Sequence, residues 1–282
     1  MRPAPPRERP RAEPAAPRSE RDAATRGSSS ADLHAFRERT LRRGVNPCVY
    51  WPLRAVLLPA FLIFFRMQRI GREHLPRRGA LLLASNHRSF LDPFVIGMMT
   101  RRPVYFMAKR ELFQKRWQAW LLNSLGAFPV DRGAGDTAAI DTTRAILERG
   151  DCVVVFPEGT RVRPGPLGAP HRGIGRLALD SGVPVVPIAV IGTEDARRGW
   201  RIRPRKVRLR AGRPLRFPLP ERASPGLAAA VTERIWACVS LQWEWLGGVV
   251  PQREAPAPRG PAQARHGRAS ENSSAREEAH AA

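Results

Sequence analysis

The sequence is poor in cysteine, in lysine and in long apolar runs. Its three cysteines, Cys48, Cys152 and Cys238, have none of the spacings that bind zinc or form a redox pair. We therefore expect buried thiols in a reducing compartment and no metal site. Lysine occurs only at positions 109, 115 and 206, so almost all of the positive charge is carried by arginine.

The excess of basic residues is the strongest feature of the composition, with a formal net charge of +23 at pH 7. Residues 1–46 contain eleven arginines against six acidic residues, a net +5, so most of the excess lies in the rest of the chain. A basic surface attracts anionic lipid, phosphorylated substrates or nucleic acid. The chain lacks the basic patches with interleaved aromatic residues that bind single-stranded nucleic acid, so we expect no nucleic-acid partner.

The longest apolar run is short compared with a bilayer. Its charge-free part, Ala55–Phe65, is eleven residues, about 16 Å as a helix against a hydrocarbon core of ~30 Å. Tyr50 and Trp51 precede it and Arg66 follows it, which is typical of a helix at the membrane interface. We predict a membrane-associating helix at 47–70 that makes the protein peripheral or monotopic. A core helix of the domain and a true transmembrane span are the alternatives.

Both ends of the chain have the composition of disordered segments. Residues 1–46 and 249–282 are dominated by Arg, Pro, Ala, Ser and Glu, and bury too little apolar surface to offset the entropy of ordering. A long charged stretch precedes the apolar run, so we expect no cleavable signal peptide. Residues 71–248 remain for one folded domain, which is long enough for a sizeable core.

Short apolar strands alternate with amphipathic helices within this domain. The predicted strands are 80–85, 104–108, 127–130, 152–156, 185–191 and 207–211, and the predicted helices are 94–99, 112–125, 137–149, 175–181 and 226–246. Such alternation is typical of a parallel sheet with helices on its faces. We predict a single α/β domain with a mostly parallel central sheet flanked by helices.

The segment Asn-His-Arg-Ser-Phe-Leu-Asp, residues 86–92, lies between a predicted strand and a predicted helix, where ligands of α/β proteins sit. His87 has a side chain suited to general-base chemistry near neutral pH. A turn through Ser89 would bring the carboxylate of Asp92 onto the imidazole, as in other His–carboxylate pairs. The simpler alternative makes Asp92 the N-cap of the next helix and His87 an ordinary loop residue.

A second polar segment, Phe-Pro-Glu-Gly-Thr-Arg at residues 156–161, follows the strand 152–156. Glu158 offers a carboxylate for hydroxyl groups, Gly159 a flexible backbone, Thr160 a hydroxyl and Arg161 a guanidinium for a phosphate. That set suits a polyol phosphate. The alternative is a surface turn with a local Glu–Arg ion pair.

Two further segments complete the pattern. Arg132 stands just after the strand 127–130, and the run 183–188 is an apolar strand bounded by prolines. Residues 173–178 imitate a dinucleotide-binding fingerprint, but they follow a Pro/Arg-rich loop where that motif needs a strand. A nucleophile elbow, a P-loop and a zinc spacing are all absent from the sequence.

Together these four segments resemble the blocks of the PlsC-type glycerolipid acyltransferase family, in the same order and at similar distances. His87 and Asp92 match the first block, a His and an Asp separated by four residues, and Arg132 matches the Arg that ends the second. Residues 156–161 match the third block at every position, and residues 186–188 match the Val-Pro-Ile strand of the fourth. The family often has a Lys shortly after the third block, where this chain has Arg172, and a Ser where it has Val162.

The resemblance implies an acyltransferase that moves a fatty acyl group from acyl-CoA or acyl-carrier protein to 1-acylglycerol-3-phosphate, giving phosphatidic acid. His87 would be the base and Asp92 its partner, and the acceptor would be bound by Arg132, Glu158, Gly159, Thr160, Arg161 and Arg172. Neither a cofactor nor a metal is implied, and the protein would work on an anionic membrane at the cytoplasmic face of the cell membrane. The resemblance sets no oligomeric state.

Two other functions stay open at this point. The same fold could acylate glycerol-3-phosphate, another lysophospholipid or a non-glycerol lipid. A more distant alternative is a basic membrane or nucleic-acid binder without enzymatic activity, which would have no need of the His87–Asp92 pair.

Overall fold

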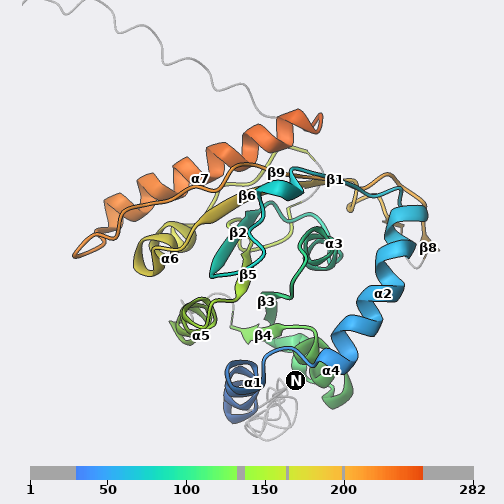
Figure 1. Cartoon of the computed structure of the whole chain (residues 1–282), viewed down its shortest axis with the longest axis horizontal. Helices are drawn as coiled ribbons and strands as arrows, with labels where there is room; N and C mark the ends of the chain where they lie inside the picture. Colours follow the sequence, from blue (N-terminus) through green and yellow to red (C-terminus); the bar gives the residue numbers. More distant parts are fainter. Residues whose placement is uncertain (1–29, 132–136, 163–164, 199–200, 250–282) are drawn as a thin grey trace, which may run out of the picture. The chain divides into compact units, whose positions relative to one another are not determined.

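A seven-stranded sheet forms the centre of the structure (Figure 1). The structure, a computed structural model, describes residues 30–131, 137–162, 165–198 and 201–249, all within one compact unit. The strands of this sheet are β1 (Gln68–Ile70), β2 (Leu81–Ser85), β3 (Val104–Lys109), β4 (Ala127–Val130), β5 (Cys152–Val155), β6 (Val185–Ile191) and β9 (Arg208–Ala211). Their order across the sheet is β1-β9-β6-β2-β5-β3-β4. A separate two-stranded sheet joins β7 (Arg197–Arg198) to β8 (Arg201–Ile202).

The sheet is mostly parallel, as the alternation of strands and helices predicts. Strands β2 to β6 all run in the same direction. Strand β9 pairs antiparallel to β6, and β1 pairs parallel to β9. The carboxyl ends of the five parallel strands therefore meet at one edge of the sheet, which is where loops of α/β proteins form sites.

The pattern of β2 shows why its run of apolar residues becomes a central strand. Leu81 and Leu83 belong to one apolar cluster, while Leu82 and Ala84 belong to the cluster on the other face of the sheet. Successive side chains of a strand point to opposite faces, and all four are fully buried. A strand covered on both faces needs a continuous apolar run in place of an alternating one.

Helices cover both faces of the sheet (Figure 1). The α-helices are α1 (Ser30–Arg43), α2 (Pro47–Ile63), α3 (Asp92–Met99), α4 (Arg116–Ser124), α5 (Thr137–Glu148), α6 (Gly173–Ser181) and α7 (Pro225–Trp245), with the 3-10 helices η1 (Arg72–His74) and η2 (Arg110–Phe113). Helices α5, α6 and α7 pack on one face, and α2, α3 and α4 lie on the other. The single helix predicted at 112–125 is in fact two, η2 and α4.

Helix α1 corrects the prediction that residues 1–46 are disordered. Leu33 is buried in the core, and Thr40 is fully buried. The side-chain amide of Asn123 in α4 donates to the Thr40 hydroxyl at 2.7 Å. The low apolar content of this segment is enough for a helix because its few apolar residues and its buried polar groups all lie against the domain. Residues 1–29 and 250–282, also predicted to be disordered, lie outside the described residues.

Helix α2 is shorter than the membrane-associating helix predicted at 47–70. It ends at Ile63, and residues 68–70 form the edge strand β1, which belongs to the central sheet. Tyr50 and Phe61 are buried, so one side of α2 is part of the core. The other side is exposed and apolar, and it includes Ile63 at 77% exposure. The helix thus combines the packing of a core helix with the exposed apolar side of an interfacial one.

The length and composition of each helix bear on whether the chain could cross a membrane. Within the described part of the chain, no single helix is long and apolar enough to cross a membrane. The bent pair formed by residues 32–43 and 47–63, with an angle of 86° between the two helices, passes the same test when taken together.

The contact between α1 and α4 gives a first prediction. The side-chain amide of Asn123 donates to the Thr40 hydroxyl and to the carbonyls of Phe36 and Ala127. Asn123→Ala should lower the free energy of unfolding by about 1–3 kcal/mol, because it leaves buried acceptors without their donor. Urea unfolding measures this change, with the exposed Gln114→Ala as control. Equal stability of the two variants would show that α1 is not fixed to the domain through Asn123.

Candidate active site

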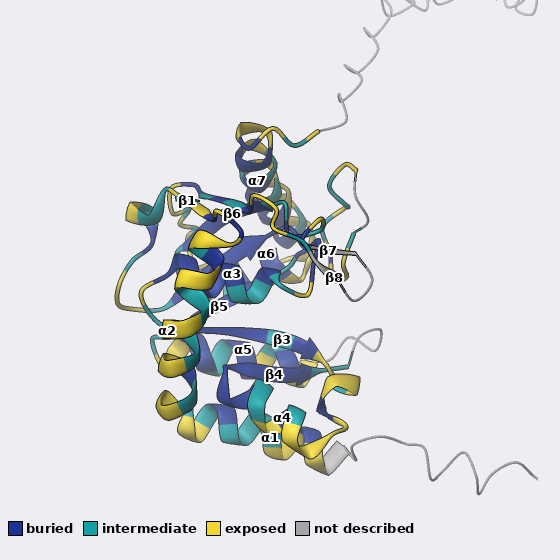
Figure 2. Cartoon of the chain, turned by 90° about the vertical axis from the view of Figure 1, so that its right-hand side faces the viewer, coloured by how far each residue is buried: buried dark blue, intermediate teal, exposed yellow. Residues whose placement is uncertain are grey.

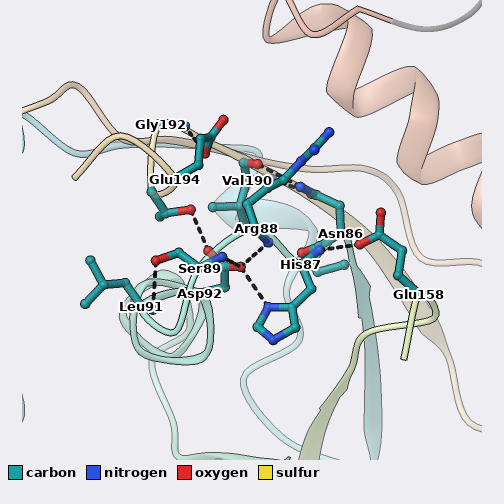
Figure 3. Close-up of polar contacts among 12 residues, drawn as sticks. Asn86, His87, Arg88, Ser89, Leu91, Asp92, Glu158, Val190, Gly192 and Glu194 are labelled. Atoms are coloured by element: carbon teal, nitrogen blue, oxygen red, sulfur yellow. Dashed lines mark hydrogen bonds and ion pairs between the residues drawn. The ribbon is translucent and has the colours of Figure 1, made fainter. Parts of the chain in front are cut away.

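The candidate site lies in the loop between β2 and α3, at the carboxyl end of the central strand (Figure 3). Asn86 begins this loop and is fully buried. Its side-chain amide donates to the carbonyl of Val190 at 2.9 Å and accepts from the backbone N–H of Val190 at 2.8 Å. Asn86 thus completes a pair of bonds with β6, as a further residue of the sheet would, and fixes where the loop starts.

His87 and Asp92 form the predicted pair. The Nδ1 atom of His87 lies 2.8 Å from Oδ2 of Asp92, and both side chains are buried. A carboxylate can only accept, so we assign the proton of the neutral imidazole to Nδ1. The lone pair of the neutral ring is then on Nε2, which is the form that a general base requires.

The carboxylate of Asp92 organises the whole loop. Its Oδ2 also accepts from the backbone N–H groups of Arg88 at 2.6 Å and Ser89 at 2.7 Å. Its Oδ1 accepts from the hydroxyl of Thr193 at 2.6 Å. The alternative role as a helix N-cap is wrong, because the carboxylate binds N–H groups before α3 and makes no side-chain cap bond to the helix.

The imidazole of His87 is held on its face as well as at its edge. Its ring stacks on the ring of Phe156, with centroids 4.1 Å apart and planes inclined by 21°. Phe156 comes directly after β5, the strand next to β2. The stack leaves the imidazole little freedom to rotate, so the direction of Nε2 is set by two independent contacts.

Glu158, predicted to contact substrate hydroxyls, makes two hydrogen bonds within the protein. It is buried, and its Oε2 accepts from the backbone N–H of His87 at 2.6 Å. Its Oε1 accepts from the backbone N–H of Gly168 at 2.8 Å. Burial raises the pKa of the Glu158 carboxyl, and the two N–H donors together with the nearby charges of Arg88 and His87 oppose that rise. Both oxygens are therefore occupied in holding two loops together.

Beyond Glu158, the segment after β5 makes a further contact with the loop that carries His87. Thr160 and Arg161 are exposed, and the next residue, Val162, donates its backbone N–H to the carbonyl of His87 at 2.9 Å. Gly159 has a φ of 67°, and a Cβ there would meet the ring of His171 at 2.8 Å. A glycine is therefore required at this position for two reasons, its backbone conformation and its close contact.

The two remaining predicted residues differ in what the structure shows. Arg172 is exposed and stands at the N-cap of α6, directly after His171. Arg172 stands at the end of the segment between β5 and α6, and Arg161 belongs to the same segment. Arg132, predicted from the second block, lies outside the described residues.

Sequence analysis missed Thr193 and the stacking role of Phe156. Thr193 follows the end of β6, a direct neighbour of β2 in the sheet. Its position two residues beyond a predicted strand could have marked Thr193 as a candidate site residue. That inference needs the knowledge that β6 lies beside β2, which the sequence does not give. Among the described residues, no group of three or more His, Cys, Asp or Glu side chains is placed to hold a metal ion.

The cysteines are free, as their spacing predicts, but only partly buried. Cys152 is buried in β5, Cys238 is partly exposed and Cys48 is exposed. Burial raises the pKa of the Cys152 thiol to about 12, so it stays protonated near neutral pH. Sequence analysis was therefore wrong to expect that all three thiols are buried.

The chain was compared with known proteins. The Acyltransferase family model matches residues 66–191. The 1-acyl-sn-glycerol-3-phosphate acyltransferase of Bacillus subtilis (strain 168) is 31% identical over 173 residues, which cover 58% of this chain and 84% of that protein. The enzyme of the same name from Pseudomonas aeruginosa is 28% identical over 194 residues, which cover 67% of this chain and 74% of that protein.

A solved structure agrees with the fold. The crystal structure of the 1-acyl-sn-glycerophosphate (LPA) acyltransferase PlsC from Thermotoga maritima matches with a TM-score of 0.52 at 21% identity. The match covers 78% of this chain and 97% of that chain. With four sequence blocks in order, a buried His–Asp pair at a strand end and relatives at this level of identity, the chain belongs to the PlsC-type glycerolipid acyltransferase family and is an acyltransferase.

Proposed function

We propose that the protein transfers a fatty acyl group from an acyl thioester to the free hydroxyl of 1-acylglycerol-3-phosphate, giving phosphatidic acid. The observation that carries the proposal is the imidazole of His87, fixed at Nδ1 by the buried Asp92 and flanked by the Phe-Pro-Glu-Gly-Thr-Arg loop. The named activity of the relatives from Bacillus subtilis and Pseudomonas aeruginosa supports this acceptor.

The reaction follows from the geometry of the pair. Nε2 of His87 takes the proton of the acceptor hydroxyl as its oxygen attacks the thioester carbonyl. The imidazolium that forms is stabilised by the Asp92 carboxylate. The tetrahedral intermediate then collapses, the C–S bond breaks, and the thiolate receives the proton from Nε2. An ester and a free thiol are produced, and His87 returns to its starting form.

Arginine side chains are suited to bind the phosphate of the acceptor. Arg161 is exposed one residue before Val162, which contacts the carbonyl of His87. Arg172 is exposed at the start of α6, and Arg132 follows β4 in the chain. A guanidinium binds phosphate through charge-assisted hydrogen bonds. With its phosphate held by these arginines, the acceptor would present its free hydroxyl to Nε2 of His87.

Other acceptors would use the same catalytic pair. Glycerol-3-phosphate, another lysophospholipid or a non-glycerol lipid differs only in the groups that Arg161 and its neighbours must bind. The donor is acyl-CoA or acyl-carrier protein. Thiol release measured with each donor and each acceptor identifies the preferred substrates, and a strong preference for 1-acylglycerol-3-phosphate is the expected result.

We further propose that the protein binds an anionic membrane through one exposed apolar surface. This surface consists of Trp51, Val56, Ile63 and Phe64 on and just after α2, and of Leu112, Trp117 and Trp120 on η2 and α4. Helices α2 and α4 are neighbours on the same side of the molecule (Figures 1 and 2).

Charged groups next to this surface favour an anionic lipid. Lys115 and Arg116 are exposed beside Trp117, and Arg66 is exposed beyond the end of α2. Tryptophan at the level of the headgroups and arginine or lysine around it are typical of interfacial proteins. We place the protein at the cytoplasmic face of the cell membrane, peripheral or monotopic, because acyl thioesters are cytoplasmic donors in the family that it resembles.

Removing the base tests the mechanism. His87→Ala should lower turnover by about 10²–10⁴-fold, the usual contribution of a general base. The variant should stay folded, because Asp92 keeps its bonds from Thr193 and from two backbone N–H groups. Turnover and thermal melting are measured together, with the exposed His34→Ala as control. Near-normal turnover in a folded His87→Ala variant would exclude His87 as the base.

The proposed contact between Arg161 and the acceptor phosphate can be tested separately. Arg161→Ala should raise KM for 1-acylglycerol-3-phosphate by about tenfold or more and leave KM for the thioester donor nearly unchanged, because a charge-assisted bond is worth roughly 1.5–3 kcal/mol. Arg78→Ala is the matched control, since Arg78 is an exposed arginine before the opposite, amino end of β2. A larger effect on the donor would assign Arg161 to the donor and not to the acceptor.

The role of the exposed apolar surface in membrane binding can be tested with variants that leave the core unchanged. Trp117→Ala/Trp120→Ala should weaken binding to anionic liposomes by about tenfold or more, because partial burial of two indole rings is worth more than about 1.4 kcal/mol. Sedimentation with the liposomes measures this binding. Trp245→Ala is the control, since Trp245 is also exposed but lies on α7.

Two further measurements separate the alternatives. Salt should weaken the binding only in part, because charge is screened and apolar burial is not. Alkaline carbonate should extract the protein from membranes. Resistance to carbonate as firm as that of an integral protein would contradict a peripheral or monotopic attachment, and unchanged binding of the double variant would exclude α4 from the surface.

A further inference from the structure

The proposed reaction uses His87 and Asp92 but not Arg88, which lies between His87 and Ser89 in the same loop. The residue is only 6% exposed. Its side chain points away from the imidazole of His87 (Figure 3). Arg88 therefore does not reach the reacting atoms through its guanidinium, and a buried guanidinium at this place needs another explanation.

The guanidinium connects two segments that are far apart in the chain. Its Nη2 donates to the carbonyl of Gly165 at 2.5 Å and to the carbonyl of Pro166 at 3.1 Å. Its central carbon lies 4.8 Å from the ring centroid of Trp243 in α7, which is a cation–π contact. Gly165 and Pro166 belong to the segment between β5 and α6, which also carries Arg161 and Arg172.

This contact adds to the bonds that the same segment already makes with the catalytic loop. Glu158 and Val162 bond to the backbone of His87 at the beginning of the segment. Arg88, the residue after His87, bonds to Gly165 and Pro166 further along the same segment. The segment is thus tied to two consecutive residues of that loop, one through backbone groups and one through a side chain.

The chemistry of the contact requires arginine. The planar guanidinium can stack on an indole ring with its face and donate to two carbonyls with its edge. A lysine ammonium is a compact charge that cannot do both from one position. The charge of Arg88 also acts on neighbouring acids, because it is among the effects that lower the pKa of Glu158 and Glu194 against the larger opposite effect of burial.

We propose that Arg88 is a positioning residue for the acceptor, which holds residues 158–162 and 165–172 so that Arg161 and Arg172 face a phosphate bound beside His87. The proposal rests on the proposed function, since it takes this segment as the acceptor site. It assigns to Arg88 an effect on acceptor binding and not on the proton transfer, because the Asp92 bond to residue 88 uses the backbone N–H, which Arg88→Lys retains.

Arg88→Lys tests the proposal by the way KM and kcat separate. KM for 1-acylglycerol-3-phosphate should rise by about tenfold, while kcat and the donor KM change by less than about threefold. Trp243→Phe, which weakens the cation–π contact with the guanidinium, should also raise KM for 1-acylglycerol-3-phosphate. The double variant should show less than the sum of the two effects on a logarithmic scale, because the two residues act through one contact.

A matched control is an arginine of β9 that contacts the same helix, α7. Arg210 lies 4.6 Å from the ring centroid of Trp245 and also bonds to Gln242, but it is not joined to the catalytic loop by any contact in the described residues. Arg210→Lys should leave the acceptor KM unchanged. If Arg88→Lys melts below the assay temperature, Trp243→Phe alone gives the result.

Hydrogen exchange provides a readout that does not depend on the acceptor. The amide of Gly168 donates to Glu158 at 2.8 Å. In Arg88→Lys this amide should exchange at least about tenfold faster, with exchange in α5 unchanged, because only the segment loosens. Unchanged exchange at Gly168, or a loss of kcat at normal acceptor KM, would overturn the role of Arg88. A wild-type enzyme that fails to acylate 1-acylglycerol-3-phosphate would instead overturn the acceptor assignment, and the exchange experiment would still decide on Arg88.

Discussion

A buried carboxylate is costly unless hydrogen bonds take up its charge, and Asp92 is fully buried. Its two oxygens accept from the imidazole of His87, from two backbone N–H groups and from the hydroxyl of Thr193. These donors fold the loop around the carboxylate, so the site exists before any substrate arrives. The position of the Nε2 atom of His87 therefore depends on one buried anionic group and on the stack of the imidazole on Phe156.

Buried polar residues tie together the loops that follow three adjacent strands, β6, β2 and β5. Asn86 bonds to Val190 at the end of β6, Thr193 bonds to Asp92, and Glu158 bonds to His87 from the loop after β5. Parallel strands make this possible, because their carboxyl ends lie side by side. Arg161, in the same loop as Glu158, is exposed. One short motif thus contains a buried residue that bonds to the loop of His87 and an exposed arginine that is free of that loop's buried contacts, which is the division of roles that the proposed function requires.

Part of the large positive charge has a structural use inside the fold. Arg54 donates to the carbonyls of Gly97 and Thr100. Arg69 donates to the carbonyl of Met98 and Arg72 to that of Met99, so three arginines cap the C-terminal end of α3. Cations are favourable at that end of a helix. Burial lowers the pKa of Arg69, and the charges of Arg72 and Arg54 lower it further. Helix α3 is thereby fixed at both ends, by Asp92 at its start and by arginines at its end. The net charge of the chain therefore overstates the positive charge that is available at the surface.

The strands that bear the motifs and the parallel sheet could be predicted from local periodicity in the sequence. The His87–Asp92 pair could be predicted from its spacing together with the resemblance to the family, while the spacing alone left the N-cap alternative open. The helix at residues 30–43, the strand at 68–70 and the contacts that Glu158, Thr193 and Arg88 make with other loops required the tertiary structure. Glu158 is 71 residues from His87, and Thr193 is 101 residues from Asp92. Contacts over such separations are set by which strands are neighbours in the sheet and by their register, and neither is encoded in any one segment of the chain.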